Sequence, residues 1–204
     1  MMRFLRCADS GLLIELADLH AVQALYAALA EAPPEGVTDL VPAARTLLLH
    51  LDPQRADAAR IEAAVRAVEP RDGARTHGDL LRVPVVYDGA DLAEVAKLTG
   101  LTEREVVHRH TSAEWTVAFG GFAPGFGYLA GGPAELAVPR RAESRTKVPP
   151  GSVGLAGAFS GIYPRESPGG WQLIGRTDLE IWRVDRDPPA LLRPGVRVRF
   201  QEVA

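Results

Sequence analysis

Cysteine and long apolar runs are scarce in this chain of 204 residues. Cys7 is its one cysteine, so the chain forms neither an internal disulfide nor a multi-cysteine metal site, which favours a reducing compartment. No stretch approaches the length of a membrane span, and the opening residues MMRFLRCADSGLL lack the apolar middle of a signal peptide. These absences predict a cytoplasmic protein.

An excess of basic charge is also lacking. The formal net charge is -3 and there is no long basic run, whereas nonspecific binding of nucleic acid needs a basic excess. His108 and His110 have no third ligand at a recognisable spacing, so no metal site is evident. Apolar residues make up 47% of the chain and charged residues 24%, which is ordinary for a soluble globular protein of one large or two small domains. We expect neither a nucleic acid nor a membrane as partner.

Three glycine-rich stretches come close to known motifs, and each misses a required part. Residues 170–177 approach the phosphate-loop spelling, yet the alternating stretch DLEIWRV (178–184) predicts a strand where that motif needs a helix. Residues 125–130 imitate a dinucleotide fingerprint, which needs a helix where Gly-Gly-Pro follows. In residues 150–154, proline replaces the first glycine of a nucleophile elbow. Close turns between strands explain these glycines better.

Residues 1–84 alternate between strand and helix patterns. Strands are predicted at 11–17, in VTDLV, in RTLLLHL and at 79–87, with helices that begin after Asp18 and Asp52. This order, β-α-β-β-α-β, is that of a small ferredoxin-like α/β domain. The predicted fold class is therefore α+β.

The composition changes in the second half of the chain. Residues 85–111 are predicted to form a helical bridge, and residues 112–204 a β-structure. Most of the 20 glycines and 16 prolines lie beyond residue 114, where short strand patterns alternate with turns, as in a closed or nearly closed sheet. Capping boxes that open the two helices of the bridge are predicted at Asp91 with Glu94 and at Thr102 with Glu105.

Four motifs in the second half carry a resemblance to a known family. They read HTSAEWTVAFGGFAPGFGYL, VPRRAESRTKVPPGSVGLAG, SGIYPRESPGGWQLIGRT and RPGVRVRF. In this combination the chain resembles the B subunit of bacterial ATP-dependent 5-oxoprolinase, a family also called KipI-like or allophanate hydrolase subunit 1. The resemblance covers nearly the whole chain and is most specific over residues 110–177. It implies an N-terminal α/β domain followed by a cyclophilin-like β-barrel.

An activity is implied by the same resemblance. The family's reaction is the opening of 5-oxo-L-proline to L-glutamate, coupled to ATP hydrolysis and carried out with separate A and C subunits. We therefore expect an enzyme subunit that is inactive alone and whose complex uses ATP, although the sequence does not locate the ATP site. Two alternatives stay open: a KipI-like inhibitor of a histidine kinase, and a carboxyltransferase lobe of a urea carboxylase or allophanate hydrolase system.

The chain departs from the family pattern at three places. Ser144-Arg145 stands where relatives usually have a second Pro-Arg pair, and Phe159-Ser160 where they often have Gln-Thr. Val196 occupies a position where relatives commonly carry aspartate. Phe159 replaces an amide that both donates and accepts hydrogen bonds, so these departures bear on the substrate more than on the fold.

Arg140, Arg145 and Arg176 are the arginines embedded in the specific motifs. A guanidinium group matches a carboxylate or a phosphoryl group in a bidentate manner. We therefore predict that Arg140 and Arg145 bind substrate and that Arg176 acts in catalysis, the alternative for each being a surface salt bridge. Arg141, one residue off the motif, is expected to point to the opposite face of its strand.

Further candidate residues come from the same motifs. His110 is predicted as a general base and Ser152 as a donor to a developing oxyanion, with a helix-terminal histidine and a turn-closing serine as the alternatives. Buried barrel aromatics are the alternative for the two aromatic candidates. The remaining predicted substrate-binding residues are Tyr163, Ser167, Trp171 and Thr177.

A glycine-rich apolar surface is expected on the barrel. Phe122, Phe126 and Tyr128 lie close together in the sequence, and an exposed patch of this kind is hard to explain on a free monomer. We expect this face to bind a partner that resembles the C subunit.

Overall fold

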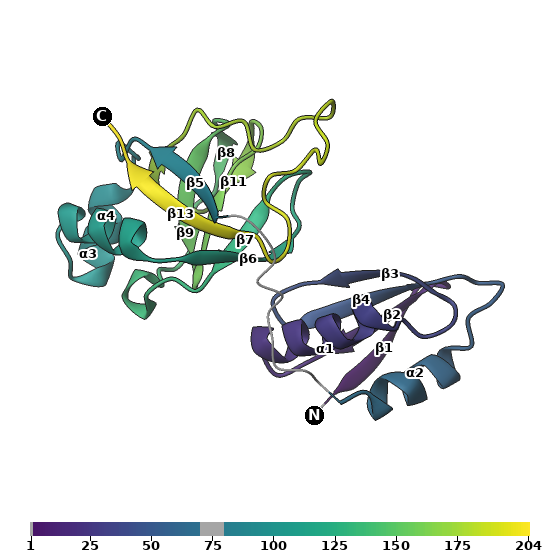
Figure 1. Ribbon diagram of the computed structural model, residues 1–204. Helices are drawn as coiled ribbons and strands as arrows, with labels where there is room; N and C mark the ends of the chain where they lie inside the picture. Colours follow the sequence, from purple (N-terminus) through teal and green to yellow (C-terminus); the bar gives the residue numbers. More distant parts are fainter. Residues whose placement is uncertain (1, 70–79) are drawn as a thin grey trace. The chain divides into compact units, whose positions relative to one another are not determined.

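The computed structural model describes residues 2–69 and 80–204, and the chain divides into two compact units, residues 1–76 and 77–204. Figure 1 shows the strands and helices of each unit. The division lies ahead of residue 84, where the N-terminal domain is predicted to end. In the described part of the chain, no helix combines the length and the apolar character needed to cross a bilayer.

Unit 1 is a four-stranded antiparallel sheet with two helices. Its strands follow the order β1-β2-β4-β3. The leucines and isoleucine that β2 and β4 turn inward form one core with the buried stripe of α1, as the alternation and the helical spacing predict. The elements are β1 (Arg3–Cys7), β2 (Gly11–Glu15), α1 (Leu19–Glu31), β3 (Val37–Pro42), β4 (Thr46–Leu51) and α2 (Ala58–Ala67).

The predicted ferredoxin-like order is wrong at its last strand. The described part of the predicted strand 79–87 forms β5 (Leu80–Val85), which pairs in parallel with β13 (Arg197–Glu202) in unit 2. In a ferredoxin-like sheet this last strand would lie beside β2. Here β1, which the sequence analysis missed, pairs with β2. The cap of α2 is also corrected, because Asp57 and not Asp52 accepts the first backbone N–H groups of that helix.

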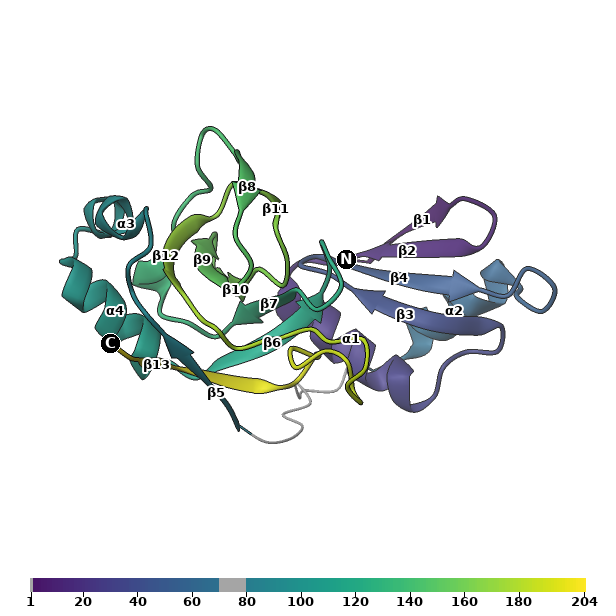
Figure 2. The same ribbon diagram turned by 90° about the horizontal axis from the view of Figure 1, so that it is seen from above.

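Unit 2 is a nearly closed β-barrel. Its main sheet follows the order β12-β9-β10-β7-β6-β13-β5, and Figure 2 shows these strands following one another around the barrel. The segment after β5 completes the circle, because Val86 exchanges backbone hydrogen bonds with β12 and the N–H groups of Gly89 and Asp91 donate to β12 carbonyls. The strands beyond β5 are β6 (Trp115–Gly120), β7 (Gly127–Ala130), β8 (Arg145–Val148), β9 (Ser152–Ala156), β10 (Phe159–Ile162), β11 (Ser167–Gly169), β12 (Gln172–Arg176) and β13.

The strand predicted at 178–184 does not form. Residues 178–180 have no regular structure, and Trp182 makes an isolated bridge to Ala190. No helix follows Thr177 either, which confirms that the stretch 170–177 is not a phosphate loop. Gly151 lies against the end of this stretch, and its position requires glycine. Its φ is +77°, and an added Cβ would lie 2.1 Å from the Thr177 carbonyl oxygen.

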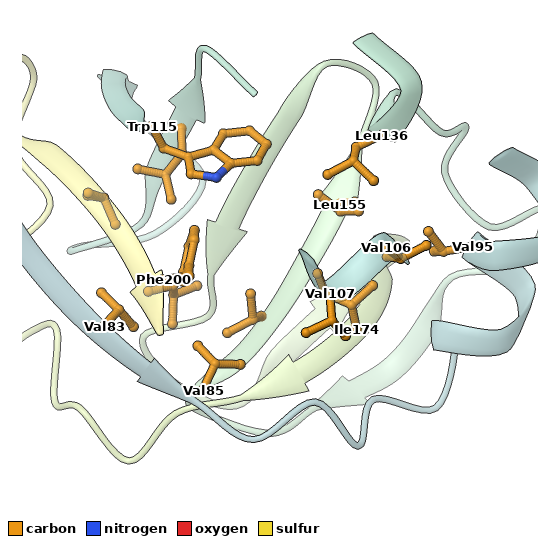
Figure 3. Close-up of a cluster of buried hydrophobic side chains, with 14 of the residues drawn as sticks. Val83, Val85, Val95, Val106, Val107, Trp115, Leu136, Leu155, Ile174 and Phe200 are labelled. Carbon is orange, nitrogen blue, oxygen red and sulfur yellow. The ribbon is translucent and has the colours of Figure 1, made fainter. Parts of the chain in front are cut away.

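The predicted helical bridge belongs to the barrel. Helices α3 (Leu92–Thr99) and α4 (Glu103–Ser112) contribute Val95, Val106 and Val107 to the same core as the strands. Figure 3 shows these valines turned toward Leu155 and Ile174 of the strands. The predicted capping box of Thr102 and Glu105 is confirmed at the start of α4. The other prediction is wrong, because the Asp91 side chain does not cap α3.

Candidate functional site

The Asp91 carboxylate joins three segments of unit 2. Its Oδ1 accepts hydrogen bonds from Arg141 Nη1 at 2.5 Å and Arg145 Nη2 at 2.7 Å, and its Oδ2 accepts one from the Leu173 N–H at 2.7 Å. The aspartate side chain is 3% exposed, and those of Arg141 and Arg145 are 35% and 22% exposed. We call these three side chains the Asp91 cluster. It carries two positive charges and one negative charge.

The surroundings of Asp91 keep it ionised. Burial of the carboxyl group raises its pKa, but hydrogen bonds from Arg145 and the Leu173 N–H, with the charges of both arginines, outweigh burial and leave the pKa below its ordinary value. One nitrogen of Arg145, Nη1, is buried without a hydrogen-bond partner among the described residues. The cluster therefore holds uncompensated positive charge beneath the surface.

The segment 139–145, which we call the arginine loop, is fixed at several points. Gln172 Nε2 donates to the Pro139 carbonyl at 3.2 Å, the Arg141 N–H donates to the Gly170 carbonyl at 2.8 Å, and the Asp91 cluster holds its far end. Arg140 lies between these anchors and is exposed. No ion pair of Arg140 is recorded among the described residues. The loop thus presents Arg140 to solvent.

Tyr163 lies beneath the arginine loop in an aromatic cluster. Its ring packs edge-to-face against Phe126 and Phe122, with centroids 5.5 Å and 6.0 Å away. A Cβ added to Gly169 would lie 2.2 Å from the Tyr163 hydroxyl, so only glycine allows this approach. Burial raises the pKa of the phenol, while a hydrogen bond from the Trp171 backbone and the charge of Arg140 oppose that rise.

The predicted apolar surface is much smaller than expected. Phe126 is buried and Tyr128 is half-buried, and both rings pack against Trp171. Only Phe122 is exposed, at 56%. The sequence places the three aromatics together correctly, but it does not reveal that two of them turn inward.

Seven of the nine predicted site residues fall into two groups. Arg140, Arg145 and Tyr163 come together around the Asp91 cluster, with Trp171 in the core below them. Ser152 and Arg176 are register partners of β9 and β12, and the Thr177 N–H donates to the Gly151 carbonyl beside them at 2.9 Å. Ser167 closes a turn by donating to the Arg165 carbonyl at 3.2 Å.

Arg176 forms a surface salt bridge, the kind of contact that its alternative interpretation gave. Its Nε lies 2.9 Å from Asp88 Oδ2, and the two side chains are 54% and 49% exposed. An ion pair of this kind is worth about 0–1 kcal/mol. The expectation for Arg141 is wrong, because Arg141 precedes β8, which begins at Arg145, and its side chain binds Asp91.

Replacing Arg176 by alanine is therefore expected to change little. The free energy of unfolding should fall by less than about 1 kcal/mol, because the lost ion pair is exposed and screened by solvent. In a reconstituted complex, kcat/KM should stay within about threefold of wild type, since the arginine is engaged by Asp88. A loss of about a hundredfold would instead restore Arg176 as a catalytic residue.

His110 lies in the barrel core and not at the surface. Its Nδ1 is 2.7 Å from the Tyr87 hydroxyl, its Nε2 is 2.8 Å from Ser160 Oγ, and its ring stacks on Phe200. The side chain is 0% exposed, and burial lowers its pKa to about 3. The imidazole is therefore neutral near pH 7 and hydrogen-bonded at both nitrogens. A general-base role for His110 stays a prediction, and it requires a path through the core.

Three residues of the site were missed as site residues by the sequence analysis. Asp91 resembled a helix cap, Arg141 was set aside as the neighbour of Arg140, and Phe122 was placed in a partner surface. Asp91 and Arg141 were missed because they are 50 residues apart in the sequence, so no local pattern links them. In the described residues, no group of three metal-ligating side chains is placed to hold a metal ion.

The fold and these motifs define a class, the carboxyltransferase-domain proteins. The family model described as carboxyltransferase domain, subdomain C and D, matches residues 2–192. Within this class the chain belongs to the family of 5-oxoprolinase B subunits. It is 42% identical over 191 residues to the 5-oxoprolinase B subunit of Escherichia coli O157:H7, covering 92% of this chain and 87% of that protein. It is 38% identical to the corresponding 5-oxoprolinase B subunit of Bacillus subtilis, covering 90% and 82%.

Solved structures share the fold of this chain. TTHA0988 is 36% identical, with a TM-score of 0.78, and its alignment covers 100% of this chain and 40% of the TTHA0988 chain. The chain therefore spans less than half the length of that protein. The Kluyveromyces lactis urea carboxylase is 18% identical, with a TM-score of 0.75, and 22% of its chain is covered. This second likeness shows a shared fold.

Proposed function

We propose that this chain is the B subunit of a complex that opens 5-oxo-L-proline to L-glutamate at the expense of ATP, together with A and C subunits. The observation that carries the proposal is the 42% identity to a 5-oxoprolinase B subunit over most of both chains. A match of this extent includes both units of the chain, so it does not reflect the barrel alone.

The charges of the site support a substrate with a carboxylate. 5-Oxo-L-proline is a five-membered cyclic amide that bears one carboxylate, and guanidinium groups recognise carboxylates in a bidentate manner. The Asp91 cluster has a positive charge left over, and Arg140 adds another at the surface. Water must attack the amide carbonyl in the reaction, and the Asp91 cluster with Arg140 offers positive charge but no base for that step. The partner subunits supply this part of the chemistry.

A carboxyltransferase lobe of a urea-degrading enzyme is the second candidate. The urea amidolyase of Saccharomyces cerevisiae is 39% identical over 66 residues, which cover 30% of this chain. That match is shorter than the match to the 5-oxoprolinase B subunits and omits most of the chain. It therefore supports a common origin more than a common substrate.

Reconstitution tests the proposal. We expect the purified chain alone to show no turnover of 5-oxo-L-proline, and the mixture of A, B and C subunits to form glutamate and ADP together. Glutamate is measured by chromatography and ADP by a coupled assay, with ATP and each of the three proteins omitted in turn. Turnover by the chain alone would contradict the need for partners. A complete complex that carboxylates urea and leaves 5-oxo-L-proline intact would favour the second candidate.

A further inference from the structure

Phe122 adopts a backbone conformation that a phenylalanine rarely takes. Its φ is +67°, in the left-handed region, and its side chain is 56% exposed. The loop that carries it is closed by hydrogen bonds from the Ala123 N–H to the Gly121 carbonyl and from the Phe126 N–H to the Ala123 carbonyl. Such a conformation is unfavourable for a phenylalanine and is often found where a side chain has a function.

The Phe122 ring contacts the same tyrosine that the arginine loop covers. Phe122 packs edge-to-face on Tyr163. The arginine loop lies beside the same tyrosine, because the Arg141 N–H donates to the Gly170 carbonyl and a Cβ added to the adjacent Gly169 would lie 2.2 Å from the Tyr163 hydroxyl. Tyr163 itself is 1% exposed, so it forms a floor and does not reach solvent. An exposed aromatic ring and an exposed guanidinium group thus flank one buried phenol.

The acidic side chains nearby do not neutralise Arg140. Glu166 is paired with Lys147 at 3.2 Å, and Glu143 contributes its backbone carbonyl, not its carboxylate, to Arg141. Arg141 and Arg145 are both bound to Asp91. Arg140 therefore retains a full set of donors for a ligand, on a loop that is already ordered.

We propose that Phe122 and Arg140 form the binding site for a small cyclic carboxylate, with the ring of the ligand on Phe122 and its carboxylate on the Arg140 guanidinium. The proposal rests on the proposed function, for which 5-oxo-L-proline is such a ligand. An aromatic ring adds contact to a ligand ring and gives nothing to a phosphate. The pair therefore fits a cyclic carboxylate better than the phosphates of ATP. A rigid loop lowers the entropic cost of binding.

Steady-state kinetics of the reconstituted complex test this site. Arg140→Gln is expected to raise KM for 5-oxo-L-proline by at least about tenfold, because a hydrogen-bonded charge pair with the ligand is lost. KM for ATP should stay unchanged. Phe122→Ala should raise the same KM by about threefold to tenfold. Arg104→Gln is the matched control, because Arg104 is exposed on α4 with no recorded ion pair among the described residues. It should match wild type.

Several outcomes would overturn the site. Unchanged KM values in both variants would do so, as would a rise in KM for ATP in place of 5-oxo-L-proline. Weaker assembly of the Phe122→Ala complex with normal KM would make Phe122 a docking residue instead. If the complex does not turn over 5-oxo-L-proline, the chain is titrated with 5-oxo-L-proline and observed by NMR. Binding that Arg140→Gln abolishes then supports the site without the proposed function, and no binding refutes it.

Discussion

Replacing Asp91 by alanine is expected to lower the free energy of unfolding of the barrel by about 3–5 kcal/mol, the cost of removing the buried partner of two partly buried charges. The Asp91 side chain is 3% exposed and binds Arg141, Arg145 and the Leu173 N–H. For a domain of this size, the loss lowers Tm by roughly 10 °C. Tryptophan fluorescence during urea or thermal unfolding measures it, because all three tryptophans lie in unit 2.

Two substitutions control this experiment. Asp91→Asn keeps the size of the side chain and an acceptor for the Leu173 N–H but removes the charge, so an intermediate loss is expected. Asp88→Ala removes the exposed partner of Arg176 and should cost less than about 1 kcal/mol. If Asp91→Ala and Asp88→Ala had equally small effects, the Asp91 cluster would not be what holds the arginine loop.

Local patterns predicted the elements of this protein better than their partners. The capping box of Thr102 and Glu105 depends on residues three positions apart, and it forms as predicted. Asp91 carries the same signal with Glu94, yet a buried N–H and two arginines from distant segments bind its carboxylate more strongly than the first turn of α3 does. A capping signature alone does not show which of the two environments an aspartate enters.

Strand pairing explains the error in the N-terminal domain. The sequence pattern of β5 predicts a strand correctly, but its partner β13 lies more than a hundred residues further along the chain and pairs with it in parallel. Alternation within a strand specifies which side chains turn inward, not which strand lies beside it. The ferredoxin-like order was therefore chosen from the sequence of elements, while β1 supplied the missing strand of the sheet.

The sequence predicted only part of the candidate site, because a local pattern does not show which distant segments meet. The family motifs placed Arg140, Arg145 and Tyr163 in one region, because these motifs describe the turns of the barrel. The motifs do not distinguish Arg145, which is bound to Asp91, from Arg140, which is exposed. That difference depends on a contact across 54 residues, so only the folded chain reveals it.

His110 is a second buried group, after Asp91, whose protonation at low pH should lower the stability of the barrel. Both of its ring nitrogens are hydrogen-bonded, to Tyr87 and Ser160, and its ring packs between Phe200 and Trp115. Burial lowers its pKa to about 3, whereas the ordinary value for an unfolded chain is about 6.5. Between these two pH values the unfolded chain binds a proton that the folded chain does not.

The free energy of unfolding is therefore expected to fall as the pH falls below about 6.5. His110 contributes a loss of roughly 1 kcal/mol for each pH unit. The contribution is fully present above pH 6.5 and is lost progressively toward pH 3. Asp91, whose pKa is also lowered in the folded state, adds its own loss only below about pH 4. Urea unfolding at pH values from 7.5 to 4.5, followed by tryptophan fluorescence, separates the two groups.

His110→Gln provides the decisive comparison for this prediction. Glutamine does not titrate, and its amide can keep a hydrogen bond to Tyr87 or Ser160, so the variant should fold with a lower free energy of unfolding at pH 7. Its stability should then depend less on pH between 6.5 and 4.5 than that of the wild-type chain. Parallel pH profiles for the two proteins would mean that His110 becomes protonated in the folded state, which in turn requires that water or a proton path reaches the core. That result would remove the structural objection to His110 as a general base.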